Sequence, residues 1–437
     1  MRLADFFGLS SKRDAPHGRE REHAIAGLIS ACHKLLTERG ELSVTRLAGE
    51  ILTSYHSLDQ SGREQFFSRL GKEFSPDPET VGRAGDAYRQ DPSPENLARL
   101  QRAVEPPRRE LFRRLNVAPG GTRVLVEMRG QVLRSTGPDA GRANIAADLK
   151  HLLTSWFNRG FLVLQRIDWR TSATILEKLI QYEAVHQIQG FPDLRRRLAI
   201  DRRCYAFFHP ALPDEPIIFV EAALTQGISD NVLPLLDPES REVPPESADC
   251  AIFYSITNCQ EGLRGVPMGS FLIKQVVEAL GREFPRIRRF ATLSPVPGFR
   301  EWLRENGPKL VPASVLVKLD DPRWFDKSKA RDELKDYMVQ LCAYYLLRAK
   351  KGKEPLDPVA RFHLRNGARL ERINWMGDMS KAGLERSAGL AVNYLYRLAD
   401  LERNHELYTR DNRVATSRDI EQLAKQATTT QVRAPRP

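Results

Sequence analysis

The sequence has 437 residues, a length that favours two domains over one or three. Its 41% hydrophobic and 28% charged residues are typical of a globular protein with a sizeable core. The formal net charge of +11 comes from basic residues spread among acids, without a dense basic tail, an RNA-binding aromatic signature or zinc-finger spacing. Solvated helix faces and a phosphate-bearing small molecule therefore explain the charge at least as well as DNA does.

The five cysteines are odd in number and form no Cys-x-x-Cys pair, which argues against a disulfide framework or a zinc ribbon. No two histidines have the spacing of metal ligands on a helix, so we expect no metal site. No apolar run approaches the length of a membrane span, and Asp5 interrupts the N-terminus before a signal-like apolar stretch forms. We expect a soluble, cytoplasmic protein.

The first part of the chain, from about residue 20 to residue 150, has mostly helical apolar spacing. The clearest segments are 25–36, 46–55 and 65–74, each with polar residues on the opposite face. Proline-containing breaks separate such segments, and none of them carries a chemical motif. We predict a helical N-terminal domain over residues 1–155.

The character of the sequence changes after about residue 155. Runs rich in β-branched and aromatic residues predict strands, and amphipathic stretches between them predict helices, which together indicate an α/β domain over residues 156–412. Residues 413–437 are polar and of low complexity, so we predict a flexible C-terminal tail. The predicted strands are 204–209, 216–224, 250–257 and 290–294, and the predicted helices are 173–186, 270–284, 298–306 and 331–347.

A glycine-containing loop, 260-QEGLRGVPMGS-270, ends one predicted strand and opens a helix. Such a loop points backbone N–H groups and the positive end of a helix dipole at one spot, which suits a phosphate or pyrophosphate. Gly265 and Gly269 allow close backbone approach, and Arg264 adds a charge. The loop matches neither the dinucleotide fingerprint nor the P-loop, and ordinary strand-to-helix punctuation explains its glycines equally well.

A second candidate is Ser294 in 291-ATLSPVPGFREWL-303. The prolines fix the backbone where a strand stops, so the hydroxyl is either held for chemistry or bonded to its local backbone, as turn serines usually are. The absence of a Gly-x-Ser-x-Gly elbow argues against a hydrolase nucleophile.

A third candidate is His363 in 357-DPVARFHLRNG-367, where Asp357 is a natural N-cap and Gly367 a natural C′ residue. A histidine in the last turn of a helix is favoured in its charged form, so we predict an imidazolium near neutral pH. An exposed capping histidine is the alternative. His209, before a proline-rich loop, is the competing candidate and reads as structural.

Four long stretches, in the same order, resemble the malonyl-coenzyme A decarboxylase family. They are 208–232, 252–276, 292-TLSPVPGF-299 and 359–396, within a similarity that runs through most of residues 155–400. The resemblance implies a helical N-terminal domain that helps form homo-oligomers, followed by a catalytic domain of the GNAT acetyltransferase fold. It also implies a homodimer or homotetramer, and cleavage of malonyl-coenzyme A to acetyl-coenzyme A and carbon dioxide without metal, biotin or another cofactor.

The same resemblance assigns roles to the three candidates. Ser294 and His363 occupy the positions of the family's catalytic serine and histidine, in intact motifs. A rigidly held hydroxyl would orient the departing carboxylate or relay a proton, and a protonated histidine would serve as the acid. The C-terminus, Ala-Pro-Arg-Pro, is not a peroxisomal address of the Ser-Lys-Leu type. The loop that grips the coenzyme A pyrophosphate corresponds to Arg264, Gly265, Val266, Pro267, Met268, Gly269 and Ser270.

Two other functions fit parts of the sequence. An acyltransferase that moves an acyl group from acyl-coenzyme A to an amine would use the same fold and the same loop, and only the residues at the acyl end argue against it. A basic nucleic-acid-binding protein would use the helical half and would show salt-sensitive binding to duplex DNA. The scattered charge makes this the weakest of the three.

Overall fold

The chain folds into two compact units. The computed structural model describes residues 14–135, 139–266 and 272–433. Unit 1 extends to residue 162 and also takes in two later segments, 209–213 and 260–268, whereas unit 2 comprises the remainder. Unit 1 is helical and unit 2 combines helices with a mixed sheet, so the predicted fold class, a helical N-terminal region followed by an α/β domain, is confirmed.

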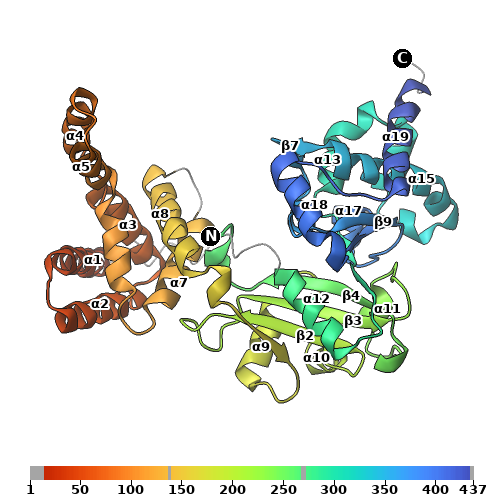
Figure 1. The fold of residues 1–437 in the computed structure, drawn as a ribbon, viewed down its shortest axis with the longest axis horizontal. Helices are drawn as coiled ribbons and strands as arrows, with labels where there is room; N and C mark the ends of the chain where they lie inside the picture. The colour runs from red at the N-terminus through yellow and green to blue at the C-terminus, as the bar shows by residue number, and fades with distance from the viewer. Residues whose placement is uncertain (1–13, 136–138, 267–271, 434–437) are drawn as a thin grey trace, which may run out of the picture. The chain divides into compact units, whose positions relative to one another are not determined.

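The helices of unit 1 begin where the sequence supplies caps. The carboxylates of Asp59 and Asp77 accept from backbone N–H groups at the starts of α3 and α4, and Asp139 does the same for α8. A proline occupies the first turn of several of these helices, where its missing N–H costs nothing. The helices are α1 (Asp14–Thr37), α2 (Glu41–His56), α3 (Gln60–Glu73), α4 (Pro78–Gln90), α5 (Pro94–Val104), α6 (Pro107–Leu115), α7 (Gly121–Arg134) and α8 (Ala140–Trp156), followed by the short 3-10 helix η1 (Arg159–Phe161) (Figure 1).

Unit 1 has its own apolar core, to which Leu35, Leu70, Leu125 and Leu149 contribute fully buried side chains. The segment that returns to it from later in the chain includes the 3-10 helix η3 (Glu261–Leu263), which packs against α7. The first half of the predicted coenzyme A loop is therefore part of the helical unit.

Unit 2 is built on one sheet, in which antiparallel pairs predominate. The strands follow the order β1-β2-β3-β4-β5-β10-β6, with β9 also paired to β10, and only β4 and β5 are parallel. The predicted strands are confirmed with shifted ends. Their bounds are β1 (Val163–Ile167), β2 (Arg202–Phe208), β3 (Ile218–Thr225), β4 (Cys250–Asn258), β5 (Arg289–Thr292), β6 (Ser294–Pro295), β9 (Arg369–Asn374) and β10 (Ala391–Leu395), beside a separate hairpin of β7 (Lys350–Lys351) and β8 (Glu354–Pro355).

The chain changes its strand partner at Ser294. The parallel pairing of β4 with β5 ends at Phe253 and Thr292. After Leu293, whose N–H donates to the Phe253 carbonyl, the chain leaves β4 and pairs with β10 through Ser294 and Val392. The last part of β4 thus loses its neighbour on this side, and the sheet opens there.

Helices cover the sheet and extend unit 2 toward the C-terminus. The helix predicted over 173–186 ends at Tyr182, because the Glu183 carboxylate binds the N–H groups of Val185 and His186 and turns the chain. The helices of unit 2 are α9 (Ala173–Tyr182), α10 (Phe191–Arg197), α11 (Leu233–Leu236), η2 (Pro245–Ser247), α12 (Leu272–Glu283), α13 (Phe299–Asn306), η4 (Gly307–Lys309), α14 (Ala313–Asp320), η5 (Trp324–Asp326), α15 (Ser328–Arg348), α16 (Pro358–Arg365), α17 (Lys381–Ser387), α18 (Leu398–Asp411) and α19 (Arg418–Arg433).

The predicted flexible tail over 413–437 is wrong for most of its length, since α19 occupies Arg418–Arg433. Its buried side chains are Ile420, Ala424 and Ala427, whose spacing forms one apolar stripe, and the helix packs along α15. Two of the three are alanines, so the apolar stripe is inconspicuous in a segment that is otherwise polar.

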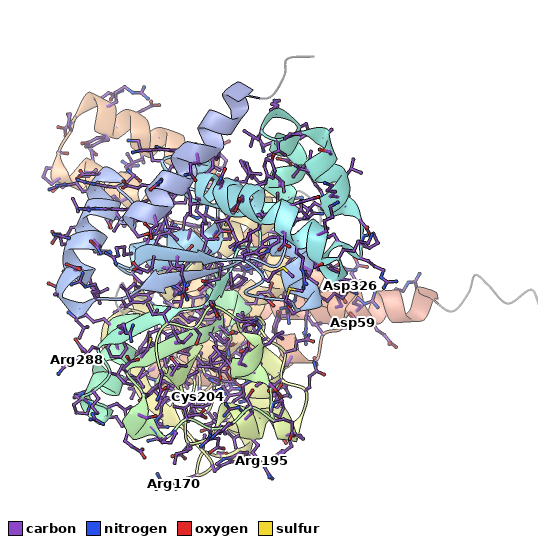
Figure 2. The ribbon with its side chains drawn as sticks, turned by 90° about the vertical axis from the view of Figure 1, so that its right-hand side faces the viewer. Asp59, Arg170, Arg195, Cys204, Arg288 and Asp326 are labelled. Atoms are coloured by element: carbon purple, nitrogen blue, oxygen red, sulfur yellow. The ribbon has the colours of Figure 1, made fainter. Side chains whose placement is uncertain are left out.

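The interior of unit 2 is largely apolar but includes buried ion pairs such as Arg197 with Glu221, and its surface is charged. Cys204 of β2 lies inside, whereas Arg170, Arg195 and Arg288 project outward (Figure 2). All five cysteines are buried and free. None of the helices in the described part of the chain is long and apolar enough to cross a membrane.

Candidate active site

Ser294 lies in β6, at the point where the chain moves from β4 to β10, and its side chain is buried. Its position is fixed on both sides. On one side, Ser294 pairs with Val392 of β10. On the other, the N–H of Val296, two residues after Ser294, donates to the Ser387 hydroxyl at 3.1 Å. The predicted rigid placement of this hydroxyl at a strand end agrees with the geometry.

His363 projects from the last turn of α16, whose ends are those that the sequence predicts. The Asp357 carboxylate accepts from the Ala360 N–H at 2.8 Å, and Gly367 follows the helix with φ of +81°. A Cβ on Gly367 would lie 2.2 Å from the Leu401 carbonyl oxygen, so only glycine fits between α16 and α18.

The two predicted residues, 69 positions apart in the chain, meet in the structure. The Nε2 atom of His363 lies 3.0 Å from the Ser294 Oγ atom, and Nδ1 lies 2.8 Å from the Tyr396 hydroxyl. The Ser294 hydroxyl donates to Thr292 Oγ1 at 2.9 Å. A continuous line of buried hydrogen bonds therefore runs from Tyr396 through the imidazole and Ser294 to Thr292.

The direction of this line follows from its ends. Thr292 Oγ1 also accepts from the Tyr394 N–H at 3.1 Å and lies within donating distance of the Val392 carbonyl oxygen, so its acceptor side serves Ser294 and Tyr394. Because Ser294 donates onward to Thr292, its oxygen accepts from Nε2–H, and Nδ1 accepts from Tyr396. The network thus assigns the neutral Nε2–H tautomer to His363.

The charge state of His363 corrects the sequence-based prediction. Burial lowers the pKa of His363 to about 3, so the ring is neutral near pH 7. Its side chain is only 3% exposed and stacks on the Tyr394 ring, with centroids 4.6 Å apart. The predicted imidazolium is wrong, because removal of water from the charged ring outweighs the weak attraction of a helix C-terminus.

A pocket of about 230 Å³ opens at Ser294 and His363, between α16 and the unpaired end of β4. Most of its wall is apolar, with Val185, Ile218, Phe253, Ile256, Pro295, Pro358, Val359 and Phe362 among the lining residues. The polar groups are few, and Ser255, Asn258 and Tyr254 join the Ser294–His363 pair. A small apolar cavity with a few polar groups has the character of a binding site for a short acyl group.

The predicted phosphate loop falls partly within the described residues. Gly265 has φ of +73°, a conformation that favours glycine, and Val266 is buried. Pro267, Met268, Gly269 and Ser270 lie outside the described residues. The predicted strand and helix on either side of the loop, β4 and α12, are present.

Arg264, the predicted charge of this loop, is already paired. Its guanidinium binds the Glu261 carboxylate, which also binds Arg134 of α7. Two arginines therefore share one carboxylate, and the Arg264 side chain is largely exposed. Any charge that Arg264 offers a ligand is reduced by this partner.

Thr292 and Tyr396 are the polar neighbours that the sequence analysis did not single out. Thr292 lies two residues before Ser294, a spacing that places both side chains on one face of an extended chain, so the signal was present. Tyr396 follows β10 and carries no local pattern that marks it. His209, read as structural, accepts from the Ala211 N–H, bonds the Trp156 carbonyl and packs on Phe157 within unit 1.

Comparison with known families finds two matches that together cover most of the chain. The family model described as the malonyl-CoA decarboxylase C-terminal domain matches residues 160–434. The model described as the malonyl-CoA decarboxylase N-terminal domain matches residues 74–157. The junction between the two matches lies close to the boundary between units 1 and 2.

Individual relatives give the same family. The mouse protein named malonyl-CoA decarboxylase, mitochondrial, is 36% identical over 365 residues, which cover 75% of this chain and 73% of that protein. A crystal structure of malonyl-CoA decarboxylase from Rhodopseudomonas palustris is 49% identical with a TM-score of 0.88, over 91% of this chain and 99% of the other. One from Agrobacterium vitis is 45% identical with a TM-score of 0.84, over 91% and 99%. With a match of this extent, the chain belongs to the malonyl-CoA decarboxylase family.

Proposed function

We propose that this chain converts malonyl-coenzyme A to acetyl-coenzyme A and carbon dioxide, with Ser294 and His363 as its catalytic residues. Family membership supports the reaction, and one observation carries the site. Ser294 Oγ and His363 Nε2 lie 3.0 Å apart in the wall of a small, mostly apolar pocket. No other pair of predicted site residues is brought together in the described part of unit 2.

The reaction breaks the bond between the malonyl methylene and its carboxylate. The electron pair of that bond moves into the thioester carbonyl, which gives an enolate and releases carbon dioxide. One proton must then reach the methylene carbon. The protein has to exclude water from the carboxylate, stabilise the enolate oxygen and supply the proton.

The neutral state of His363 makes Ser294 the proton donor in this scheme. An enolate is a stronger base than an alkoxide, so a neutral hydroxyl is acidic enough to protonate it. The Ser294 oxygen that remains keeps the Nε2–H hydrogen bond, and Tyr396 holds the ring in the tautomer that provides it. Solvent restores the serine proton after the product leaves, which balances the one proton that the reaction consumes.

The apolar wall of the pocket accelerates the first step. A carboxylate loses stabilising water when it enters such a cavity, whereas carbon dioxide carries no charge and loses little. The apolar part of the pocket wall, which includes Phe253 and Phe362, is therefore a better place for the departing carboxylate than bulk solvent.

Three further features of the sequence-based prediction belong to the same proposal. The thioester is itself the electron sink, so we propose that no metal, biotin or other cofactor takes part. We also propose a homodimer or homotetramer formed through the helical unit. The cytoplasmic location stays a prediction, and the name of the mouse relative given above describes that protein as mitochondrial.

The test is to incubate the purified protein with malonyl-coenzyme A, a chelator and no acceptor, and to follow acetyl-coenzyme A by mass. Conversion without an acceptor supports decarboxylation, whereas coenzyme A released only when an amine is present supports the acyltransferase. Salt-sensitive binding to duplex DNA without either reaction supports the nucleic-acid-binding protein.

Two variants assign the site. Ser294→Ala and His363→Asn should each lower kcat by about a thousandfold or more, because each removes part of the proton path, while acetyl-coenzyme A still binds. Cys342→Ala in α15 is a suitable control, being a fully buried change outside the pocket. A Ser294→Ala enzyme with near wild-type kcat would remove Ser294 from the mechanism.

A further inference from the structure

The helical unit holds the start of the predicted coenzyme A loop at close range. A Cβ on Gly262 would lie 1.8 Å from the carbonyl oxygen of Val126 in α7, so the loop backbone touches the helix backbone directly. Gly130, one turn further along α7, faces the same glycine. Approach this close requires glycine on the loop and leaves the segment little freedom to move.

Arg129 of α7 fixes the loop further through backbone carbonyls. Its guanidinium donates to the Gly262 oxygen at 2.5 Å, to the Arg264 oxygen at 2.9 Å and to the Ala146 oxygen of α8 at 3.2 Å. The side chain is only 4% exposed. One buried residue therefore joins two helices of unit 1 to both sides of Leu263.

Among the described residues, the charge of Arg129 has no carboxylate partner. All three of its acceptors are carbonyl oxygens, and burial together with nearby Arg264 lowers its pKa from the ordinary value, although a guanidinium remains charged. Burying a cation without a counter-ion is costly, and an anion bound nearby would offset that cost. The environment of the loop thus favours negative charge.

A second cation lies beside the loop and is unpaired. The Lys150 ammonium of α8 is 3.8 Å from the point where a Cβ on Gly265 would be. Lys150 is exposed, and its ammonium has neither a hydrogen bond nor an ion pair with any residue in the described ranges. It lies one turn after Ala146, the α8 residue that Arg129 binds.

We propose that Lys150 of the helical unit binds a phosphate group of coenzyme A, and that Arg129 positions the loop at Gly262 and Arg264 beside it. This inference rests on the proposed function, since it takes coenzyme A as the carrier of the substrate. Lys150 takes the role for which the sequence suggested Arg264, because Arg264 is held by Glu261 and Lys150 is not.

Lys150→Gln tests the contact, with acetyl-coenzyme A as the titrated ligand in calorimetry. At low salt we expect Kd to rise about tenfold, because a charge-assisted contact to phosphate is lost at a partly solvated site. Lys72→Gln, an exposed lysine of α3, is the matched control and should leave Kd unchanged. An unchanged Kd in Lys150→Gln would overturn the contact.

S-acetylpantetheine, which carries no phosphate, separates this contact from a general loss of structure. The wild type and Lys150→Gln should bind it equally, and an equal loss for both ligands would overturn the proposal. A third ligand, acetyl-3′-dephospho-coenzyme A, locates the contact. A loss with this ligand as large as with acetyl-coenzyme A assigns Lys150 to the pyrophosphate, and a smaller loss assigns it to the 3′-phosphate.

Arg129→Gln tests the positioning role against Arg108→Gln. Arg108 is equally buried in unit 1, and its guanidinium donates to Asp148 at 2.5 Å and to Phe74 and Ser75, none of which belongs to the loop. Both changes should lower thermal stability, but only Arg129→Gln should raise KM for malonyl-coenzyme A, by about tenfold with kcat within about threefold. The KM of Arg129→Lys should lie between the values of the wild type and Arg129→Gln. Equal KM values in the two glutamine variants would show that Arg129 has no role beyond folding.

The outcomes separate this inference from the proposed function. If acetyl-coenzyme A binds, Lys150→Gln weakens it and malonyl-coenzyme A is not converted, the decarboxylase proposal fails and the inference stands. If malonyl-coenzyme A is converted and Lys150→Gln binds like the wild type, the inference fails alone.

Discussion

The two candidate binding regions are held in different ways. Ser294 and His363 of unit 2 are fixed by hydrogen bonds between side chains, in a line that ends at Tyr396 and Thr292. The loop at Gly262 in unit 1 is fixed through its backbone, by a buried guanidinium and by direct helix contact. A site that moves a proton needs each hydrogen in a defined place, whereas a site that grips phosphate needs a shaped backbone. Substitutions should therefore affect catalysis at the first site and affinity at the second.

Beyond the Ser294 and His363 variants, the largest effect is expected from Gly262→Ala. The added methyl group would overlap the Val126 carbonyl oxygen, so the loop must move away from α7. We expect a loss of several kcal/mol in unfolding free energy and a loss of acetyl-coenzyme A affinity of about a hundredfold, comparable to other overpacked sites. Chemical denaturation and calorimetric titration measure the two.

Gly82→Ala is the matched control, since Gly82 lies inside α4 with nothing within 4 Å of its Cβ position. There alanine should stabilise the protein by about 0.5–1 kcal/mol through its better helix propensity. If Gly262→Ala instead bound acetyl-coenzyme A like the wild type, a fixed loop would not be needed for affinity.

Tyr396→Phe tests the other side of the comparison. It removes the donor to His363 Nδ1 and leaves the ring tautomer unselected, so we expect kcat to fall about thirtyfold while KM stays within about twofold. Tyr394→Phe retains the ring that stacks on His363 and serves as the control. A rise in KM without a fall in kcat would mean that Tyr396 binds substrate and does not orient the imidazole.

The pH dependence of kcat separates a neutral His363 from the imidazolium that the sequence suggests. With a pKa of about 3, His363 stays neutral across the working range, and its titration contributes no change in kcat between about pH 5 and 8. An imidazolium acid would lose rate as the pH rises through its ordinary value of about 6.5. If kcat of the wild type fell with a midpoint near about pH 6.5 and kcat of His363→Asn did not, His363 would be the acid after all.

Sequence reasoning predicted the parts of the site that depend on local chain chemistry. The cap at Asp357, the end at Gly367 and the strand end at Ser294 follow from residues that are neighbours in sequence. The charge of His363 depends on the Tyr394 ring and on other residues distant in the chain, which exclude water from the imidazole. No local sequence pattern around His363 indicates this burial. Arg264 is a different case, because its partner Glu261 lies only three residues before it and the pair was open to sequence reasoning. The second arginine on that carboxylate, Arg134, is distant in the chain and was not.

The fold shows the same division. Strongly periodic segments and β-branched runs predicted the central strands β2 to β5 and some of the helices, because one buried face is enough to define such elements. The return of residues 260–266 to the helical unit was missed, because no local sequence pattern around Gly262 indicates that Val126 is its neighbour. The C-terminal helix was missed because alanine supplies most of its apolar stripe.

Two helices, one in each unit, begin with the same Asp-Pro dipeptide. Asp77 and Asp357 both cap a helix whose next residue is proline, in α4 of unit 1 and α16 of unit 2. Hydrogen bonds from Thr80 lower the pKa of the exposed Asp77, whereas burial raises the pKa of Asp357 to about 6. The same dipeptide therefore has opposite electrostatic effects in the two units.

The smallest predicted effect follows from the sign of these shifts. A raised folded-state pKa gives stability that is complete below the unfolded value and is lost as the pH rises through about 6, so ionised Asp357 weakens the fold at neutral pH. Asp357→Asn keeps an oxygen to cap Ala360 and removes that cost. Near pH 8 it should raise the unfolding free energy by on the order of 2 kcal/mol, and near pH 4 it should change it little.

Asp77→Asn should have the opposite sign and lower the unfolding free energy near neutral pH. The reason is that a lowered pKa gives stability that is present at neutral pH and is lost only on acidification. Denaturant unfolding of both variants across this range measures the contrast. A less stable Asp357→Asn near pH 8 would mean that the carboxylate is better solvated than its burial indicates, and the dry environment inferred for His363, on the same helix, would then have to be revised.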